Sequence, residues 1–411
     1  MANHRVVITG MGIVSPLGNT VNDFFANLMA GKSGIQRLQS DFVDRLDIKI
    51  AAQVELDPMQ HFGKHKISTL DRVSQFALYA AGQAIADAKL DMEQVDKTRI
   101  GVYIGTGMGG ATSMEEGYVH LYRDNADRLK PYTVLMVMNN AAASAIALEY
   151  RLAGPNLTFS TACSSSSVSI GEAFQKIRHG YADVILAGGA EALITLGTMK
   201  AWEALHALAS EDKVDIAASC KPFSANRTGL VLGEGSAMLV LEDMEHALVR
   251  GATIHAEITG YGSGNDSFHI TQPSAEGQAR AMLAALDCAG LKPEHIGYIN
   301  AHGTATPLND PIETEAIKLV FGEYAYRVPV SSTKSMHGHL MGATAAVEFV
   351  ACVMALKQQA LPPTINLHQS DPKCDLDYIP NVGRTDIAIE HTMSNSFAFG
   401  GTSGVLIASK T

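Results

Sequence analysis

The chain contains little tryptophan, cysteine and charge. One Trp and five Cys occur among 411 residues, and charged residues make up 18%. An odd number of cysteines without C-x-x-C spacing indicates neither a disulfide framework nor a zinc ribbon. No stretch reaches about 18 uncharged apolar residues, and the start lacks the pattern of a secretion signal. These absences argue against a secreted scaffold or a membrane-spanning chain, and we expect a soluble protein of the reducing cytoplasm.

The charge that is present is mainly acidic. Asp and Glu number 42 against 31 Lys and Arg, which gives a net charge of −11. This balance argues against generic binding to nucleic acid or to anionic membranes. Hydrophobic residues amount to 46%, with 37 Gly, as is usual for a packed α/β protein. The length predicts two domains or one large, internally repeated fold.

Internal repeats favour the second possibility. Short β-branched runs alternate with Ala-rich helical stretches along the whole chain, which predicts layers of strands and helices. Three early segments match three later ones in the same order: IGVYIGTG and IGYINAHG, FSTACSS and SSTKSMH, GEGSAMLV and GGTSGVLI. The first match sets Thr106 opposite His302. We expect two similar halves, residues 1–250 and 251–411, packed as one body, with a shared site at their strand ends.

Cys163 lies between a predicted strand and a predicted amphipathic helix, in LTFSTACSSSSVSIGEAFQKI. Free N–H groups and partial positive charge at a helix N-terminus lower the pKa of a thiol and bind an oxyanion. The alternative for any cysteine is a small buried hydrophobe. We keep that interpretation for Cys220, Cys288, Cys352 and Cys374, and predict Cys163 as the nucleophile.

His302 ends another predicted strand, in YINAHGTATP. Gly303 permits a close backbone approach there, and Glu313 lies at the start of the next helix. We interpret His302 as a site residue, with a histidine satisfied within a loop as the alternative.

The segment VPVSSTKSMHGHLMGATAAVE adds a second polar cluster. Lys334 ends an apolar strand, an unusual place for a cation unless a carboxylate or an active site accepts it. His339 and Glu348 are further candidates, and His337 is expected to be a neighbour. His302, His337 and His339 together offer three imidazoles for zinc, but Lys334 would repel the ion. We therefore expect no metal, and two neutral imidazoles that act as N–H donors.

The segment NSFAFGGTSGVLI near the end of the sequence places Phe397 and Phe399 before Gly400 and Gly401. The alternative is that Phe397 and Phe399, two residues apart on one strand, are an aromatic pair of the hydrophobic core. The functional interpretation is a gate, whose glycines let the backbone swing and present an N–H group to the site.

These motifs carry a family resemblance: TACSSS at Cys163, NAHGTATP at His302, STKSMHGHLMGA at Lys334 and His339, and NSFAFGGTS at Phe399. From VVITGMGIVSPLG to its last strand, the chain resembles the β-ketoacyl-acyl-carrier-protein synthases of the synthase II type. The resemblance implies the thiolase fold, an α/β fold of two duplicated α-β-α-β-α layered halves. It also implies an acyltransferase that joins a Cys-bound acyl chain to malonyl on acyl carrier protein by decarboxylative Claisen condensation.

The resemblance also implies a role for each catalytic residue. Cys163 accepts the acyl group as a thioester, helped by its helix dipole. His302 and His339 point N–H donors at the malonyl thioester carbonyl and stabilise the enolate that forms when carbon dioxide departs. The N–H groups of Cys163 and Phe399 bind the tetrahedral oxyanion.

Supporting roles and two departures follow from the same resemblance. Lys334 and Glu313 are expected to form a buried charged pair that holds the histidines. Phe397 and Gly400 support the gate. The family's gate usually reads Phe-Gly-Phe-Gly-Gly-Thr-Asn, so Ala398 restricts the backbone conformations there and Ser403 has a shorter reach than Asn.

The resemblance implies no bound cofactor, because the substrates arrive on the 4′-phosphopantetheine arm of acyl carrier protein. The carrier is acidic, as is this chain, so docking needs a local basic surface. Five residues in two predicted loops offer one, with ordinary solvated charge as the alternative: Lys64, Lys66, Arg72, Arg128 and Lys130. Met108 and Trp202 line the acyl tunnel by family analogy, or belong to the core.

The pathway and the assembly stay open. TACSSSS and GTATPLNDPIE lean toward polyketide synthase modules, so fatty acid elongation and a dedicated polyene or polyketide route are both possible. A homodimer is expected, or a heterodimer with a chain-length-factor paralogue. Two other classes compete with the ketosynthase: a non-catalytic chain-length partner, which lacks the nucleophile, and a cysteine hydrolase, which transfers its acyl group to water without malonyl.

Overall fold

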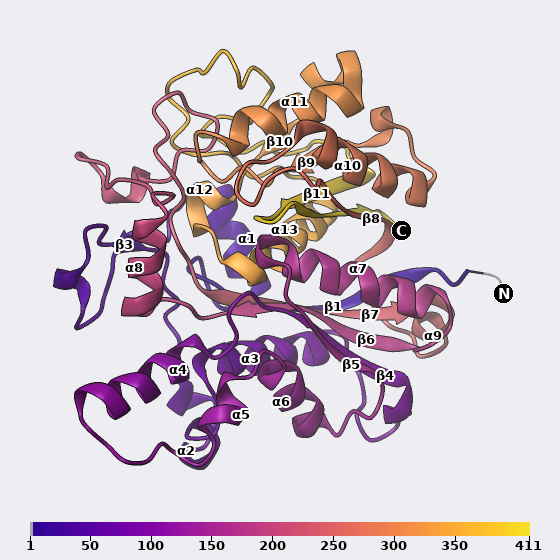
Figure 1. Ribbon diagram of the computed structural model, residues 1–411. Helices are drawn as coiled ribbons and strands as arrows, with labels where there is room; N and C mark the ends of the chain where they lie inside the picture. Colours follow the sequence, from indigo (N-terminus) through magenta and orange to yellow (C-terminus); the bar gives the residue numbers. More distant parts are fainter. Residues whose placement is uncertain (1–2) are drawn as a thin grey trace.

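The structure is a computed structural model that describes residues 3–411, and ten of its strands form one large sheet (Figure 1). The ten strands follow the order β10-β9-β11-β12-β8-β1-β7-β6-β4-β5. The first five-strand group comprises β1 (Val6–Val14), β4 (Ile100–Gly105), β5 (Asn156–Phe159), β6 (Val184–Glu191) and β7 (Gly235–Asp243). The second comprises β8 (Ala256–Asn265), β9 (Tyr298–Asn300), β10 (Val330–Ser331), β11 (His391–Phe397) and β12 (Thr402–Ser409).

The two groups of strands have the same topology. In the first, β7 pairs antiparallel with β1 and β6, and β4 pairs parallel with β6 and β5. In the second, β12 pairs antiparallel with β8 and β11, and β9 pairs parallel with β11 and β10. A short antiparallel pairing between β1 and β8 joins the two groups. The predicted duplication of the fold is therefore confirmed.

The three sequence matches lie on equivalent strands. The first covers β4 and β9, the second begins at the ends of β5 and β10, and the third covers β7 and β12. The predicted boundary between residues 250 and 251 falls between α9 (Met244–Val249) and β8. As a division between two halves it stays a prediction.

Helices complete five layers (Figure 1). The outer helices of the first half are α3 (Arg72–Asp87) and α6 (Ala141–Tyr150), and those of the second are α10 (Ala275–Ala289) and α11 (Asn309–Phe321). Two central helices, α7 (Ser165–Arg178) and α13 (Thr344–Gln358), contact each other between the two groups of strands. This arrangement is the predicted α-β-α-β-α order.

Small residues allow the central helices to pack closely on the strands. A Cβ atom at Gly105 would lie 2.3 Å from the backbone of Ser165 and Ser166, and one at Gly404 would lie 2.3 Å from Oγ of Ser167. The end of β4 thus rests directly on the first turn of α7. Such contact fixes the start of α7, and with it the residue just before the helix.

The segments after β5 and β10 differ in length. After β5 the chain enters α7 through a single 3-10 turn, but after β10 the helix α12 (Lys334–His337) and a loop precede α13. The match of FSTACSS with SSTKSMH therefore aligns the strand ends but not the central helices, because the counterpart of α7 begins at Thr344. The extra segment carries the predicted polar residues of this region.

The remaining elements surround these layers. They are α1 (Val21–Met29), β2 (Gln36–Arg37), β3 (Ile50–Ala51), α2 (Lys64–Ile67), α4 (Ala111–Tyr118), the π-helix Val119–Arg123, α5 (Thr133–Val137) and α8 (Leu196–Ala204). The stretch Met341–Gln358 is long and apolar enough to cross a membrane, but 89% of it is buried in the protein. It includes the central helix α13, and a core position accounts for its composition.

Candidate active site

Cys163 sits at the turn that leads into α7. Ala162 adopts a left-handed conformation, with φ of +51°, and begins the 3-10 turn Ala162–Ser164. The hydroxyl of Ser165 accepts the N–H of Thr161 at 2.9 Å and donates to the carbonyl of Ala162 at 2.6 Å. The turn is therefore fixed on both sides of Cys163, whose side chain is buried.

Burial controls the ionisation of Cys163. Removal from water raises the pKa of its thiol to about 11, although the charge of Lys334 and the N–H groups of Phe399 and of Cys163 itself lower it. The expected lowering at the helix start thus operates but is outweighed by desolvation. Both N–H groups predicted to bind an oxyanion therefore act on the sulfur, since each lowers the pKa of the thiol.

His302 and His339 lie beside this sulfur. Their rings meet edge to face, with centroids 5.5 Å apart, and their nitrogens lie with the Sγ of Cys163 within 4.8 Å of one another. Both side chains are buried. Burial lowers the pKa of each imidazole well below its usual value, and the charge of Lys334 lowers it further. Both histidines are therefore neutral at physiological pH.

The hydrogen bonds of His339 define its tautomer. The N–H of Met341 donates to Nδ1 at 3.1 Å, and Nδ1 also lies 2.9 Å from the hydroxyl of Thr344. Because Nδ1 accepts, the proton of the neutral ring is on Nε2. This Nε2 is buried and has no hydrogen-bond partner among residues 3–411. A buried unpaired donor beside the sulfur is suited to a substrate carbonyl.

Lys334 pairs with a different carboxylate from the one expected. Its Nζ lies 2.6 Å from Oε1 of Glu348, and both side chains are buried. Burial raises the pKa of Glu348 to about 7, although Lys334 lowers it. Glu313 instead accepts the backbone N–H groups of His302 and Gly303, each at 2.7 Å. The predicted pair of Lys334 and Glu313 is wrong, because both oxygens of Glu313 are used to hold the His302 loop.

His337 is a neighbour of the site. Its Nδ1 lies 2.8 Å from the carbonyl of Gly338 and its Nε2 lies 2.9 Å from the hydroxyl of Thr333. The imidazoles of His302, His337 and His339 therefore do not converge as a zinc set. The donor atoms that converge belong to Cys163, His302 and His339, and the positive charge of Lys334 acts on all three, which disfavours a cation there.

A cavity of about 310 Å³ leads to these three side chains. One wall is the segment after β9, including Thr304, Thr306 and Asn309. The gate residues Phe397, Ala398, Phe399, Gly401 and Ser403 line it from β11 and β12, and Leu205, His206, His269 and Ile270 line it from other segments. The cavity provides a route from the surface to the buried sulfur.

The predicted gate is the turn between β11 and β12. The N–H of Ala398 donates to Thr402, the N–H of Gly401 donates to Ala398, and Gly400 and Gly401 have φ of +83° and +81°. Ala398 is outside the left-handed region, so its Cβ causes no strain in this conformation. The carbonyl of Ile270 accepts the N–H of Gly400 at 2.8 Å. Phe397 faces the site, with its ring 6.0 Å from that of His302.

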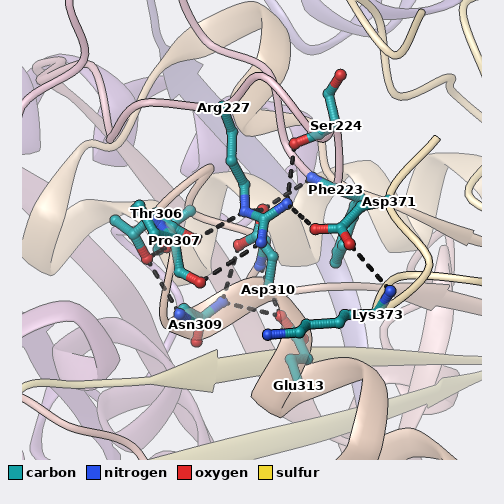
Figure 2. A network of polar contacts seen from close by, with 12 residues as sticks. Phe223, Ser224, Arg227, Thr306, Pro307, Asn309, Asp310, Glu313, Asp371 and Lys373 are labelled. Atoms are coloured by element: carbon teal, nitrogen blue, oxygen red, sulfur yellow. Dashed lines mark hydrogen bonds and ion pairs between the residues drawn. The ribbon is translucent and has the colours of Figure 1, made fainter. Parts of the chain in front are cut away.

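Arg227 holds the cavity wall from behind (Figure 2). Its buried guanidinium donates to the carbonyls of Thr306 at 3.1 Å and Pro307 at 3.4 Å, and pairs with Asp371 at 2.6 Å. Asp310 lies 3.8 Å away. Burial raises the pKa of Asp310 to about 6, although Arg227 lowers it. A positive charge buried among carbonyls and carboxylates thus fixes the backbone of this wall.

Asn309 extends this network toward the histidine (Figure 2). Its amide lies 3.3 Å from an oxygen of Asp310 and 3.3 Å from an oxygen of Glu313. Glu313 holds the N–H of His302, as described above. The cavity wall and the loop that carries His302 therefore belong to one connected set of hydrogen bonds.

Glu191 has a related position in the first half. One oxygen accepts the N–H groups of Gly107 at 2.7 Å and Gly342 at 2.9 Å, and the other accepts that of Met108 at 3.1 Å. It joins the two halves close to Cys163, since its charge raises the pKa of that thiol. Glu191 ends an apolar strand, the same signal that singled out Lys334. No comparable pattern marked Arg227 or Asp310.

The residues predicted for the acyl tunnel do not line the cavity. Met108 is 47% exposed, and Trp202 stacks on Phe399 instead. Three of the five predicted docking residues are paired with carboxylates: Lys66 with Glu149, Arg72 with Glu234, and Lys130 with Glu116. The basic surface is therefore partly neutralised within the chain itself.

Comparisons with family models and with a known relative indicate one and the same family. Residues 3–247 match the family model "Beta-ketoacyl synthase, N-terminal domain" and residues 255–368 match "Beta-ketoacyl synthase, C-terminal domain". A 3-oxoacyl-[acyl-carrier-protein] synthase 2 from Coxiella burnetii is 42% identical, over 100% of this chain and 99% of that protein.

Two solved structures match 100% of both chains. One is a type II polyketide synthase acyl-carrier protein in complex with its ketosynthase bound to the hexaketide, with a TM-score of 0.91 and 36% identity. The other is the ishigamide ketosynthase/chain length factor, with a TM-score of 0.92 and 33% identity. The structural comparisons and the sequence comparisons thus indicate the same group of proteins.

Proposed function

The chain belongs to the β-ketoacyl synthase family of condensing acyltransferases, and from that premise we propose that it acts as a 3-oxoacyl-[acyl-carrier-protein] synthase. In this reaction an acyl chain on Cys163 condenses with malonyl on acyl carrier protein. The convergence of Cys163, His302 and His339 within 4.8 Å at the end of a cavity carries the proposal. No bound cofactor is needed, because both substrates arrive on the 4′-phosphopantetheine arm of the carrier.

The first step loads the enzyme. The sulfur of Cys163 bonds to the acyl carbonyl, the bond to the carrier sulfur breaks, and the thiol proton passes to the leaving sulfur. The N–H groups of Cys163 and Phe399 bind the transient oxyanion, at about 2.7 to 4 kcal/mol per donor. The raised pKa of the thiol keeps it protonated until substrate is present.

The second step uses the histidines. The bond between the malonyl methylene carbon and its carboxylate breaks, and carbon dioxide leaves. The electron pair of that bond forms an enolate, whose oxygen accepts hydrogen bonds from the N–H groups of His302 and His339. The enolate carbon attacks the acyl carbonyl, and the sulfur of Cys163 leaves and takes up a proton. The depressed pKa of both imidazoles suits this role, since they donate hydrogen bonds without carrying charge.

A second subunit is part of the proposal. The edge strand β5 and the nearby helices expose apolar side chains: Leu157 on β5, Leu148 on α6, and Val134 and Leu135 on α5. An exposed apolar edge strand favours pairing with another chain. We propose a homodimer in the cytoplasm. The likeness to the ishigamide ketosynthase/chain length factor favours a second candidate, a secondary-metabolite ketosynthase that pairs with a chain-length-factor paralogue.

Intact-mass analysis tests the reaction. The enzyme is incubated with carrier proteins that bear saturated, unsaturated or aryl acyl chains, and malonyl carrier is then added. We expect an acyl adduct that disappears as a 3-oxoacyl carrier forms, and the preferred chain will distinguish fatty acid from polyene substrates. Cys220→Ala, which removes another buried cysteine, should load as the wild type does.

Three outcomes contradict the proposal. An adduct that persists in Cys163→Ala removes the assigned nucleophile. An adduct that water releases without malonyl indicates a hydrolase, and the absence of any adduct indicates a non-catalytic partner. Light scattering of the purified chain separates a homodimer from a monomer that awaits a paralogue.

A further inference from the structure

One oxygen of Glu191 holds backbone from both halves of the fold. Glu191 ends β6, and its Oε2 accepts the N–H of Gly107, in the first half, at 2.7 Å and that of Gly342, in the second half, at 2.9 Å. Its Oε1 accepts the N–H of Met108 at 3.1 Å and the hydroxyl of Thr106 at 3.3 Å. The side chain is buried. Its carboxylate thus fixes a residue of the second half to a strand end of the first.

The surroundings of Glu191 suit an ionised carboxylate. Three backbone N–H groups and one hydroxyl contact its two oxygens, and the ionised form accepts hydrogen bonds from all of them. Burial raises the pKa of Glu191, although these four groups lower it. Gly342 also lies just before α13, and a helix N-terminus favours negative charge. The hydrogen bonds to Glu191 are therefore of the strong, charge-assisted kind.

Gly342 belongs to the turn that sets the tautomer of His339. This turn is Met341–Ala343, and its first residue has a left-handed φ of +47°. Such a conformation costs free energy in a residue with a side chain, and it persists only where the surroundings hold it. The N–H of Met341 donates to Nδ1 of His339 at 3.1 Å. Glu191 therefore holds the residue next to the one that donates to the imidazole.

The hydroxyl that also contacts this ring leaves the tautomer open. Nδ1 of His339 lies 2.9 Å from the hydroxyl of Thr344, and a hydroxyl can donate or accept. The N–H of Met341 can only donate, so it is the contact that requires an unprotonated Nδ1 and a proton on Nε2. The N–H donor that the proposed reaction needs is therefore kept while this turn stays in place.

We propose that Glu191 is a positioning residue for His339. The turn that Glu191 holds presents the N–H of Met341 to Nδ1, and the ring keeps its proton on Nε2 for the substrate carbonyl. Glu313 holds the N–H of His302 within the second half, whereas Glu191 acts from the first half on a histidine of the second. The benefit to condensation rests on the proposed function, but the tautomer does not, so either can fail alone.

Nitrogen NMR of the protein with isotope-labelled histidine tests the tautomer without substrate or turnover. The signals of His339 are those that disappear in His339→Ala. We expect the Nε2–H form in the wild type and a mixture of both tautomers in Glu191→Ala. Glu191→Asp, which is one methylene shorter, should give the same mixture and serves if the alanine variant does not fold. A single, wild-type tautomer in these variants overturns the proposal, whatever the condensation assay shows.

Glu242→Ala is the matched control for the loss of a buried carboxylate. Glu242 is buried on β7 opposite Val184, which lies roughly 23 Å from Glu191 along β6. Its carboxylate pairs with Arg250 at 2.6 Å. The His339 signals and the kcat of this variant should equal those of the wild type. A tautomer mixture in Glu242→Ala as well would mean that any loss of stability releases the ring, which overturns the specific role of Glu191.

Kinetics test whether the position of His339 affects condensation. Glu191→Ala should lower kcat by about 10- to 100-fold, because a misplaced donor has a cost of this order, with KM for the carrier unchanged, since Glu191 does not line the cavity. In the His339→Ala background, the same change should lower kcat by no more than about twofold, because the positioned group is already absent. Losses that multiply in the double variant overturn the positioning role.

The conservative variant provides a rescue. Glu191→Gln should keep kcat within about threefold of the wild type, since its amide oxygen still accepts the N–H groups of Gly107 and Gly342. A loss in Glu191→Gln as large as in Glu191→Ala contradicts the role of these two hydrogen bonds. A tautomer mixture in Glu191→Ala, found for a wild type that does not condense its substrates, supports the positioning of the ring and contradicts only the proposed function.

Discussion

The two halves use the same strand ends for different purposes. After β4, the N–H groups of Gly107 and Met108 are held by Glu191, and after β9 those of His302 and Gly303 are held by Glu313. The residue opposite His302 is Thr106, a buried threonine. A buried carboxylate thus steadies the loop in each half, and the halves differ in the side chain at this position, a threonine in the first and a histidine in the second.

The turns before the central helices show a second difference. Ala162 and Met341 both have left-handed φ, of +51° and +47°, and each begins the 3-10 turn that leads into α7 or α13. The next residue is Cys163 in the first half and Gly342 in the second. A Cβ atom at Gly342 would lie 2.5 Å from the N of Gly107. The second half therefore has no room for a nucleophile at the equivalent position.

The largest expected effect is the loss of the nucleophile Cys163, which should stop acyl loading, whereas loss of an N–H donor such as His339 should not. Cys163→Ala should abolish acyl loading and lower condensation by at least about 10⁴-fold, because the covalent route is lost. His339→Ala should load at close to the wild-type rate, since its N–H acts on the malonyl carbonyl. Acyl-adduct formation measured by mass over time checks this. Equal loading defects in both variants would contradict the division of labour between the halves.

The next effect compares the two equivalent strand ends. His302→Ala should lower the kcat of condensation by about 10²- to 10³-fold, the usual loss for one oxyanion donor. Thr106→Ala removes two long hydrogen bonds of its hydroxyl, one donated to Glu191 and one accepted from the N–H of Gly109, each at 3.3 Å, and should change kcat by no more than about threefold. Steady-state kinetics with matched carrier substrates measure both. Similar losses in the two variants would show that the halves share the chemistry.

Sequence motifs located the reactive side chains better than their partners. Cys163, His302, His339 and Phe399 lie in distinctive local patterns, and the structure brings all four together. The partner of Lys334 was mispredicted, because it depends on which turn of α13 faces the lysine, and this packing leaves no local signal. The sequence also predicts a lowered pKa for the Cys163 thiol, whereas burial raises it.

The repeats predicted the topology for a physical reason. Strand matches survive because each strand must pack on both faces, which restricts its residues. The segment between β10 and α13 is buried too, but it has no strand pattern, so the alignment of FSTACSS with SSTKSMH does not show its extra length. Arg227 was missed for a related reason: a buried arginine in a polar loop resembles any exposed arginine in sequence.

Cys163, the residue that distinguishes the first-half turn, ionises only at high pH. The pKa of the Cys163 thiol is about 11. At pH values below 11, each rise of one pH unit increases the thiolate fraction about tenfold, and the thiolate is the form that is alkylated. Iodoacetamide should therefore modify Cys163 about 100-fold faster at pH 9 than at pH 7. Peptide mass analysis follows the rate at this cysteine alone. A rate that levels off below pH 8 would mean that the helix-start donors outweigh burial.

The smallest effect concerns the wall that only the second half supplies. Arg227→Lys keeps the charge but loses the planar set of donors that reaches the carbonyls of Thr306 and Pro307. The wall should loosen, and KM for the carrier substrate should increase by about 3- to 10-fold with kcat within about twofold, because one or two hydrogen bonds are lost. Initial rates over a range of carrier concentrations measure the two constants separately.

Arg384 provides the matched control for this last comparison. It forms a two-pronged pair with Asp377, at 2.7 and 2.6 Å, and does not line the cavity. Arg384→Lys should lower the melting temperature less than Arg227→Lys does, because Arg384 is more exposed, and should leave KM unchanged. If KM increases equally in both variants, the effect comes from a general loss of packing. If KM increases only in Arg227→Lys, the buried guanidinium shapes the wall along which the carrier arm reaches Cys163.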